Sequence, residues 1–254
     1  LLLLALLAVV LFCGFFTKNV SAATKTGFVT INGKTYYVKE NGSKAKGWLQ
    51  LGKYKYYFNK KTGIQQKGWM VDSKGRKRYF TSKAGVMMTG WLKDSKGNRR
   101  FFDPDTGFMT TGWIELDGET YYMYKKSGVA ATGWVTNKNG AKRYFSQDDC
   151  TMMTGWAKSE SNYKRYFDEE SGIMYTGLKK VGDNYYYFYS KSGVMATGWL
   201  TSSTGNKRYF DETSGIMAIG SVTISGKSYT FKNNGILILL TIRIKPITTE
   251  MIQG

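Results

Sequence analysis

The chain has 254 residues and a formal net charge of +19, from 37 Lys and Arg against 18 Asp and Glu, and it contains no histidine. The lack of histidine removes the commonest general base and the commonest zinc ligand, so we expect no enzyme, no cofactor and no metal site. The 30 Gly, 19 Tyr, 14 Phe and 7 Trp favour short strands joined by tight turns. The positive charge favours an anionic partner.

Residues 1–22 have the pattern of a secretory signal peptide that is incomplete at its N-terminus. An apolar run from Leu1 to Phe16 leads to the small-residue site Val20-Ser21-Ala22. The alternative is a membrane anchor, for which the apolar run is short. We predict export, a location at the cell wall or cell surface, and no transmembrane segment after signal removal. An exported chain is a poor partner for nucleic acid.

Tandem repeats of 20–22 residues are predicted over residues 23–235, and they are the strongest signal in the sequence. Each unit begins with Gly-Trp, an aromatic pair follows nine or ten residues later, and then comes Gly, an aliphatic residue and often Met. All tryptophans of the chain belong to this motif: Trp48, Trp69, Trp91, Trp113, Trp134, Trp156 and Trp199.

Each unit is predicted to form one β-hairpin. Turn-rich runs such as 94–98 and 137–140 separate the Gly-Trp from the aromatic pair and suit a hairpin loop. No stretch shows sustained helical periodicity. Because one hairpin of this size cannot bury its apolar face, the units must stack. The fold class is therefore all-β.

A longer period groups the units in threes. The Gly-Trp intervals run 21, 22, 22 and repeat, so that three units span 65 residues. The 22-residue units carry two basic residues before the aromatic pair, whereas the 21-residue units carry Tyr56, Tyr121 and Tyr186 there. We interpret this as a β-hairpin repeat solenoid with about three hairpins per turn.

The segment Gly85-Val86-Met87-Met88-Thr89-Gly90-Trp91 resembles the choline-binding, or cell-wall-binding, repeat of Gram-positive surface proteins. Glucan-binding repeats and the oligosaccharide-binding repeats of clostridial toxins are similar in pattern. The resemblance covers about residues 27–235 and implies a left-handed solenoid of hairpins. It also implies a cation–π cage for choline, made by the Gly-Trp tryptophan, a second Trp, a Tyr of the neighbouring hairpin and a Met.

One element of that cage is absent. A cation at the position of the second Trp would repel choline, and only Tyr185 can replace this wall. The position holds Lys55, Lys77, Arg99, Thr120, Lys142, Lys164, Tyr185 and Lys207.

The aromatic residues have two interpretations. They fill the core of the repeat array, or some of them form ligand slots. Slots are favoured where the basic pair is missing nearby. As ligand-binding residues we predict the seven Gly-Trp tryptophans together with Tyr121, Tyr122, Tyr185 and Tyr186.

The basic pairs also have two interpretations, because charged runs usually form a solvated face. The alternative is a positive ladder along one edge that binds teichoic acid or another phosphate-bearing polymer. Only one residue of each pair can join such a stripe, since strand neighbours point to opposite faces. The predicted anion-binding residues are Arg78, Arg100, Arg143, Arg165 and Arg208.

Three classes of function remain in view. The leading prediction is a secreted, non-catalytic module that binds cell-wall polymer (teichoic acid or peptidoglycan-associated glycan) or extracellular polysaccharide. The others are a structural or adhesive surface protein without a small ligand, and the targeting half of a wall hydrolase that lacks its catalytic domain. The acidic clusters at 148–149 and 168–170 are interpreted as turn residues. Residues 236–254 form a divergent tail or cap.

Overall fold

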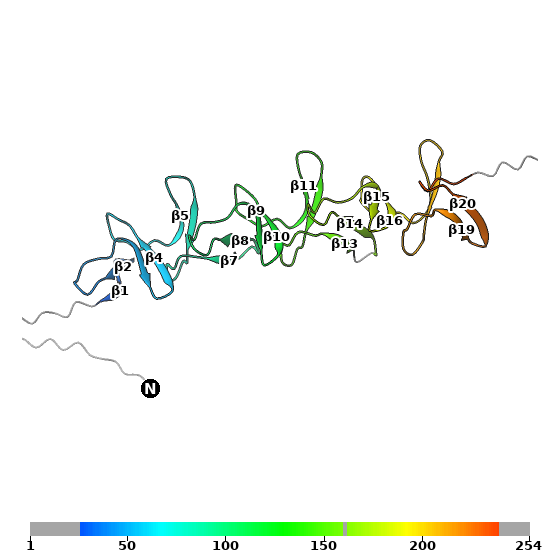
Figure 1. Cartoon of the computed structure of the whole chain (residues 1–254). Helices are drawn as coiled ribbons and strands as arrows, with labels where there is room; N and C mark the ends of the chain where they lie inside the picture. The colour runs from blue at the N-terminus through cyan, green and yellow to red at the C-terminus, as the bar shows by residue number, and fades with distance from the viewer. Residues whose placement is uncertain (1–25, 160–161, 239–254) are drawn as a thin grey trace, which may run out of the picture. The chain divides into compact units, whose positions relative to one another are not determined.

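The computed structural model describes residues 26–159 and 162–238. The predicted signal peptide at 1–22 and most of the predicted tail at 236–254 lie outside these residues. Every regular element described is a β-strand, which confirms the all-β class (Figure 1). The strands are β1 (Gly27–Ile31), β2 (Lys34–Val38), β3 (Gly47–Leu51), β4 (Tyr54–Phe58), β5 (Gly68–Val71), β6 (Lys77–Phe80), β7 (Gly90–Lys93), β8 (Arg99–Phe102), β9 (Gly112–Leu116), β10 (Glu119–Met123), β11 (Gly133–Thr136), β12 (Lys142–Phe145), β13 (Gly155–Lys158), β14 (Lys164–Phe167), β15 (Gly177–Val181), β16 (Asn184–Phe188), β17 (Gly198–Thr201), β18 (Lys207–Phe210), β19 (Gly220–Ile224) and β20 (Lys227–Phe231).

The described part of the chain falls into two compact units, which we treat separately. Unit 1 comprises residues 26–94 and 101–109, and unit 2 comprises residues 95–100 and 110–238. Within the described ranges, no helix is long and apolar enough to cross a membrane.

Consecutive strands pair into hairpins, as the repeat predicts. The strands described form ten two-stranded antiparallel sheets, and each sheet contains two strands that are adjacent in the chain. In the hairpin β11–β12, Trp134 lies opposite Tyr144 and Gly133 lies opposite Phe145. The two residues of each aromatic pair therefore point to opposite faces of the hairpin.

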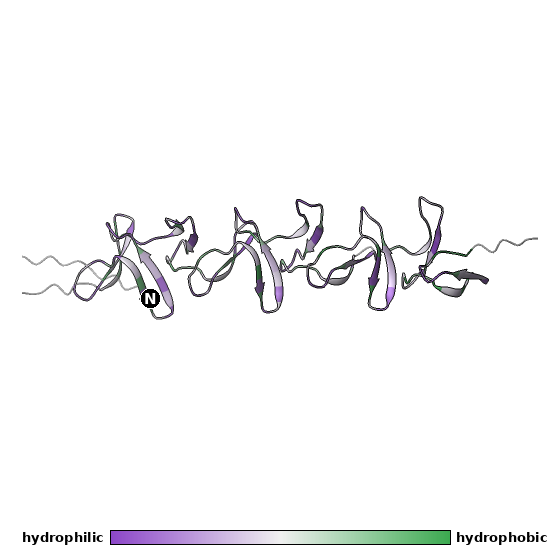
Figure 2. Ribbon diagram, turned by 45° about the horizontal axis from the view of Figure 1, so that its top comes forward, coloured by the Kyte–Doolittle hydropathy of each residue, from purple (hydrophilic) through white to green (hydrophobic). Residues whose placement is uncertain are grey.

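The core is a series of small clusters rather than one interior. The second residue of the aromatic pair is the more deeply buried one, and the largest fully buried side chains include Phe58, Phe80, Phe145, Phe188 and Phe210. In unit 2, for example, Phe188 and Met195 cluster with Tyr166 of the preceding hairpin. Figure 2 shows hydrophilic and hydrophobic residues mixed along the hairpins and connectors.

Backbone hydrogen bonds join each connector to an earlier hairpin. The Met152 N–H donates to the Thr120 carbonyl, and the Met174 N–H donates to the Lys142 carbonyl, each at 2.8 Å. In unit 1 the Met87 N–H donates to the Lys55 carbonyl at 2.8 Å. Each of these connectors is thus bonded not to the hairpin that it follows but to the second strand of the hairpin before that one. An isolated two-stranded hairpin is only marginally stable, so this stacking supplies the missing burial.

The Gly and Met of the connectors pack on one another. A Cβ on Gly193 would meet the Met174 side chain, and Gly193 also has a φ of +65° that disfavours other residues. The Gly-aliphatic-Met motif is therefore a packing pattern that links each connector to the next. The same contact occurs at Met87–Gly107, Met152–Gly172, Met195–Gly215 and Met217–Gly235.

One pair of connectors departs from this pattern at both positions. Cys150 replaces the glycine, with a φ of +72°, and is 3% exposed. Ala130 stands at the methionine position of the preceding connector and is 4% exposed. The small alanine leaves room for the cysteine side chain, so the two exchanges compensate in volume.

We expect Ala130→Met to lower the free energy of unfolding by about 1–3 kcal/mol, because a longer side chain would be forced against Cys150. The double variant Ala130→Met/Cys150→Gly restores the usual Met–Gly contact and should recover most of that loss. Urea denaturation measures both. Ala84→Met, at an exposed connector position, is the control and should change little; an Ala130→Met variant as stable as the parent would contradict the packing argument.

Candidate functional site

The Gly-Trp tryptophans lie at the surface and not in the core. Trp48 is 49% exposed, Trp113 51% and Trp134 49%. Each is the second residue of its strand, on the face opposite to the buried side chains, and the burial pattern of β11 alternates accordingly. Of the two interpretations of the tryptophans, the structure therefore favours exposure on an outer face.

The covered half of each indole is packed between two hairpins. Trp134 contacts Tyr144 of its own hairpin, with ring centroids 5.1 Å apart, and Phe167 of the next hairpin at 5.9 Å. Trp48 repeats this geometry with Tyr57 at 5.1 Å and Phe80 at 6.0 Å. Trp134 and Trp48 are thus each held in place by the next hairpin in the chain.

A second residue of the next hairpin also faces the indole. It stands two residues before the buried end of the second strand, and we call it the facing position. In the sequence this position is held by Tyr56, Arg78, Arg100, Tyr121, Arg143, Arg165, Tyr186, Arg208 and Tyr229. The hairpins before Tyr56 and Arg208 carry Phe28 and Leu178 in place of the tryptophan.

At three facing positions the guanidinium of an arginine lies on the tryptophan of the preceding hairpin. Its carbon is 5.2 Å from the ring centroid for Arg78 on Trp48, and 5.1 Å for Arg143 on Trp113. For Arg165 and Trp134 the distance is 5.6 Å. These are cation–π distances.

Each of these arginines also donates its Nε–H to a carbonyl of the following connector. The distance is 2.6 Å from Arg143 to Ser171, 2.9 Å from Arg165 to Ser192 and 2.8 Å from Arg78 to Thr106. Arg100 and Arg208 make the same bond, to Ser127 and Asn234 respectively, at 3.1 Å. The five arginines predicted as an anionic-polymer ladder are thus fixed in place by their own chain.

Where the facing position is tyrosine, the phenol ring takes the place of the guanidinium. Tyr186 lies 5.0 Å from Trp156, and Tyr229 lies 5.1 Å from Trp199. The alternation of 21- and 22-residue units therefore decides whether a ring or a cation covers the preceding tryptophan. The sequence displayed the alternation, but the partner of each residue lies about 30 positions earlier and is visible only in the fold.

The predicted tyrosines do not form one site. Tyr122 packs on Trp113 at 4.8 Å, and Tyr186 is 8% exposed against Trp156. Tyr185 is 41% exposed and lies opposite Lys180 on the other face of its hairpin. The repeat that contains Trp113 lacks a basic pair. Trp113 nevertheless has a cation beside it, because Arg143 reaches it from the next hairpin.

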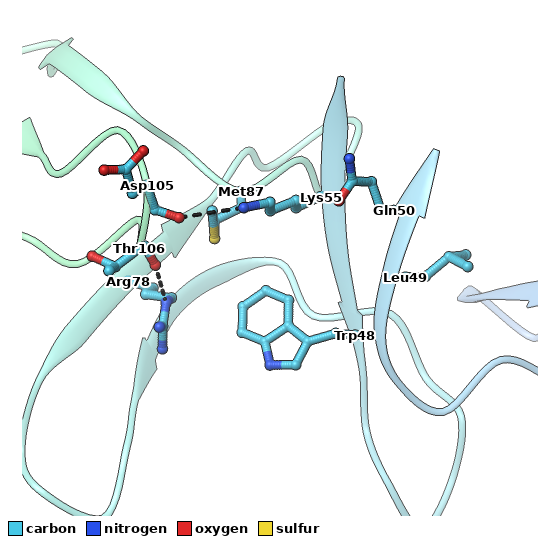
Figure 3. Close-up of a pocket in the computed structure, with 8 residues that line it drawn as sticks. All are labelled: Trp48, Leu49, Gln50, Lys55, Arg78, Met87, Asp105 and Thr106. Atoms are coloured by element: carbon cyan, nitrogen blue, oxygen red, sulfur yellow. Dashed lines mark hydrogen bonds between the residues drawn. The ribbon is translucent and has the colours of Figure 1, made fainter. Parts of the chain in front are cut away.

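Lysines hold the position of the second cage tryptophan in two cavities. Lys55 lines a cavity of about 400 Å³ in unit 1 together with Trp48, Arg78 and Asp105, and its Nζ donates to the Asp105 carbonyl at 3.3 Å (Figure 3). Lys142 and Trp134 line a cavity of about 310 Å³ in unit 2. We call these the Trp48 cavity and the Trp134 cavity.

The pKa of Arg78 in the Trp48 cavity reflects its burial and a nearby cation. Burial lowers the pKa of the Arg78 guanidinium, and the nearby charge of Arg76 lowers it further. Both act against the charged form, yet the normal arginine pKa is so high that the group stays protonated at neutral pH. The side chain is therefore a permanent cation beside Trp48.

The acidic clusters serve the connectors, as the turn interpretation predicts. The Ser171 N–H donates to the Asp168 carboxylate at 2.8 Å, and the Thr151 N–H donates to Asp149 at 3.1 Å. Glu169 accepts a 2.6 Å hydrogen bond from the Tyr166 hydroxyl, which raises the pKa of Tyr166 to about 12. In the described ranges, no group of three or more Cys, Asp or Glu side chains is placed to hold a metal ion.

Repeated hairpins that each bond to their neighbours and present exposed tryptophans define the class of β-hairpin repeat proteins. A family model for a choline-binding repeat matches residues 74–111, 139–176 and 175–221, and a model for a cell wall binding repeat matches residues 26–44 and 111–130. Together they match more than half of the chain. The chain belongs to the choline-binding, or cell-wall-binding, repeat family.

Solved structures share the fold of this chain. The structure of CbpJ from Streptococcus pneumoniae has a TM-score of 0.61 at 25% identity, over 84% of this chain and 94% of that chain. Choline binding protein F from Streptococcus pneumoniae has a TM-score of 0.60 at 23% identity, over 85% of this chain and 93% of that chain. The latter was also solved in the presence of a peptidoglycan analogue. No curated protein sequence matches this chain significantly.

We expect Arg143→Ala to lower the free energy of unfolding by about 1–2 kcal/mol, because the chain loses both a cation–π contact and a hydrogen bond. Arg143→Lys should recover little, since lysine has no Nε–H donor in the required geometry. Chemical denaturation measures both variants. Lys138→Ala, in the exposed loop of the same hairpin, is the control. Full rescue by lysine would show that charge alone matters at this position.

Proposed function

We propose that this chain is a secreted, non-catalytic repeat module that binds bacterial cell-wall polymer or a surface glycan. The observation that carries the proposal is the repeated presentation of half-exposed tryptophans, each backed by the next hairpin. A large rigid ring held in this way gives contact area to a sugar or cation at little cost in conformational entropy. The repeat family is consistent with a wall ligand, and the apolar run from Leu1 to Phe16 supports export.

The binding residues we propose are of two kinds. The tryptophans, with Tyr121, Tyr122, Tyr185 and Tyr186, would supply aromatic contacts. The five arginines at the facing position would supply positive charge to an anionic polymer such as teichoic acid. The terminal N–H groups of the guanidinium (Nη1 and Nη2) would face the polymer, while the Nε–H donates within the chain. The net charge of +19 supports a polyanion as partner.

We further propose that the hairpins wind into a solenoid with about three hairpins per turn. Within unit 2 the Lys142 Nζ donates to the carbonyl of Lys191 at 3.3 Å, and Lys164 reaches Thr213 at 3.5 Å. A side chain of one hairpin thus meets the connector that follows two hairpins later. That spacing supports a turn of about 65 residues, with Trp134 and Trp199 on one edge. A crystal structure that places these two on opposite sides of unit 2 would rule it out.

Retention on wall material should come from several weak contacts that engage one polymer. If the arginines bind polymer phosphate, retention on isolated walls should fall steeply with salt, because exposed charges are screened over about 10 Å at ~0.1 M. It should also fall when wall teichoic acid is removed. A pull-down on isolated walls across a salt series, with and without teichoic acid, measures this.

Two sets of substitutions separate charge from packing in that pull-down. Changing Arg78, Arg100, Arg143, Arg165 and Arg208 together to Ser should reduce retention strongly. The same five changed to Lys lose the same packing but keep the charge. At a temperature at which circular dichroism shows both variants folded, the Lys variant should therefore keep most of the retention that the Ser variant loses. Retention that ignores both salt and the Ser set would leave the tryptophans as the binding surface. Release of wall fragments by the chain alone would contradict its non-catalytic role.

A further inference from the structure

The Trp134 cavity gathers several cations around one indole. Lys142, Arg165 and Lys191 line it, together with Thr136 and Ser192. A second hollow of about 470 Å³ shares Trp134 and Arg165 and adds Lys158. No carboxylate stands among the described residues that line either hollow. The surroundings of Trp134 are therefore strongly positive.

Contacts within the chain hold two of these cations, Lys142 and Arg165, in place. The Lys142 Nζ donates to the Lys191 carbonyl at 3.3 Å, and the Arg165 Nε donates to the adjacent Ser192 carbonyl at 2.9 Å. Arg165 also lies over Trp134, so its guanidinium is supported on one side by the ring. The side chains of Lys142 and Arg165 are therefore ordered before a ligand arrives, which favours binding.

From this arrangement we infer that the Trp134 cavity binds an anionic phosphate group and rejects quaternary ammonium ions. The inference rests on the proposed function, since it names the chemistry of one subsite for a phosphate-bearing polymer. A planar guanidinium and a nearby ammonium suit phosphate oxygens. A quaternary ammonium ion would instead meet fixed like charges, although the exposed indole alone would attract it.

The Trp48 cavity provides an internal comparison. Lys55 and Arg78 stand there as Lys142 and Arg165 do in the Trp134 cavity, and each makes the equivalent carbonyl bond. At the connector position of Lys191, however, unit 1 carries Asp105, so that an anionic residue replaces a cationic one at the edge of this cavity. Its backbone carbonyl faces Lys55, and its carboxylate points away from Lys55 and Arg78 (Figure 3). Phosphate should therefore bind more weakly in the Trp48 cavity than in the Trp134 cavity.

An exchange of these two connector residues tests the inference. The full chain is titrated calorimetrically with glycerol phosphate, glucuronate and tetramethylammonium at constant ionic strength. Lys191→Asp should weaken glycerol phosphate binding about fivefold, the range of one exposed charge pair. Asp105→Lys should strengthen it or add a site. Both residues are exposed and accept their hydrogen bonds through backbone carbonyls, so folding should be unaffected.

Charge-matched controls separate the cavity from the overall charge. Lys138→Asp and Asp183→Lys make the same changes in exposed hairpin loops and should leave phosphate binding nearly unchanged. Equal effects of cavity and loop variants would overturn the inference, as would the absence of saturable phosphate binding. Tighter binding of tetramethylammonium or glucuronate than of glycerol phosphate would also overturn it.

The wall pull-down keeps this inference distinct from the proposed function. If the chain is retained on walls but Lys191→Asp and Asp105→Lys leave phosphate binding unchanged, the subsite alone is refuted. Phosphate binding that follows the exchange, without any retention on walls, would refute the proposed function and leave the subsite standing.

Discussion

The packing of each hairpin on the next is the contact on which the other features depend. A two-stranded hairpin alone leaves its aromatic residues exposed to water. Here the second strand of the following hairpin covers part of them. Phe167 closes on Trp134, and the connector methionine closes on the glycine of the next connector. Stability is therefore distributed along the repeats, as in other arrays whose units contact mainly their neighbours. The tryptophan is left half exposed as a result of this arrangement and is available to a ligand.

The facing position joins stability to specificity. A guanidinium and a phenol ring both have a flat surface that packs on an indole, so arginine and tyrosine exchange there without disturbing the stack. Arg165 on Trp134 and Tyr186 on Trp156 lie at 5.6 Å and 5.0 Å, respectively. The exchange changes the charge beside the tryptophan from neutral to positive. A repeat array of this kind can thus alter its ligand chemistry unit by unit while its backbone stays the same.

The connectors contribute more to the candidate site than their sequence indicates. They supply the carbonyl groups that hold Arg165 and Lys142, and the variable residue Asp105 or Lys191 that sets the local charge. Such positions have no motif of their own, because any residue offers a backbone carbonyl. The compensating pair Ala130 and Cys150 is similar. In the sequence, each of these two residues looks like an unrelated departure from the repeat motif. The structure relates them, because they occupy the paired Met and Gly positions of successive connectors.

The sequence by itself determined the hairpins, their boundaries and the repeat family, because alternation along a strand, turn glycines and the aromatic pair are local patterns. It also displayed the alternation of arginine and tyrosine at the facing position. Only the tertiary structure decided which tryptophan lies beside Arg143 or Tyr186, and that Trp113 has a cation beside it. It also decided that the tryptophans are half exposed while the phenylalanines at the ends of the second strands are buried. These outcomes depend on which face of a hairpin meets its neighbour about 30 residues away, and no local pattern carries that information.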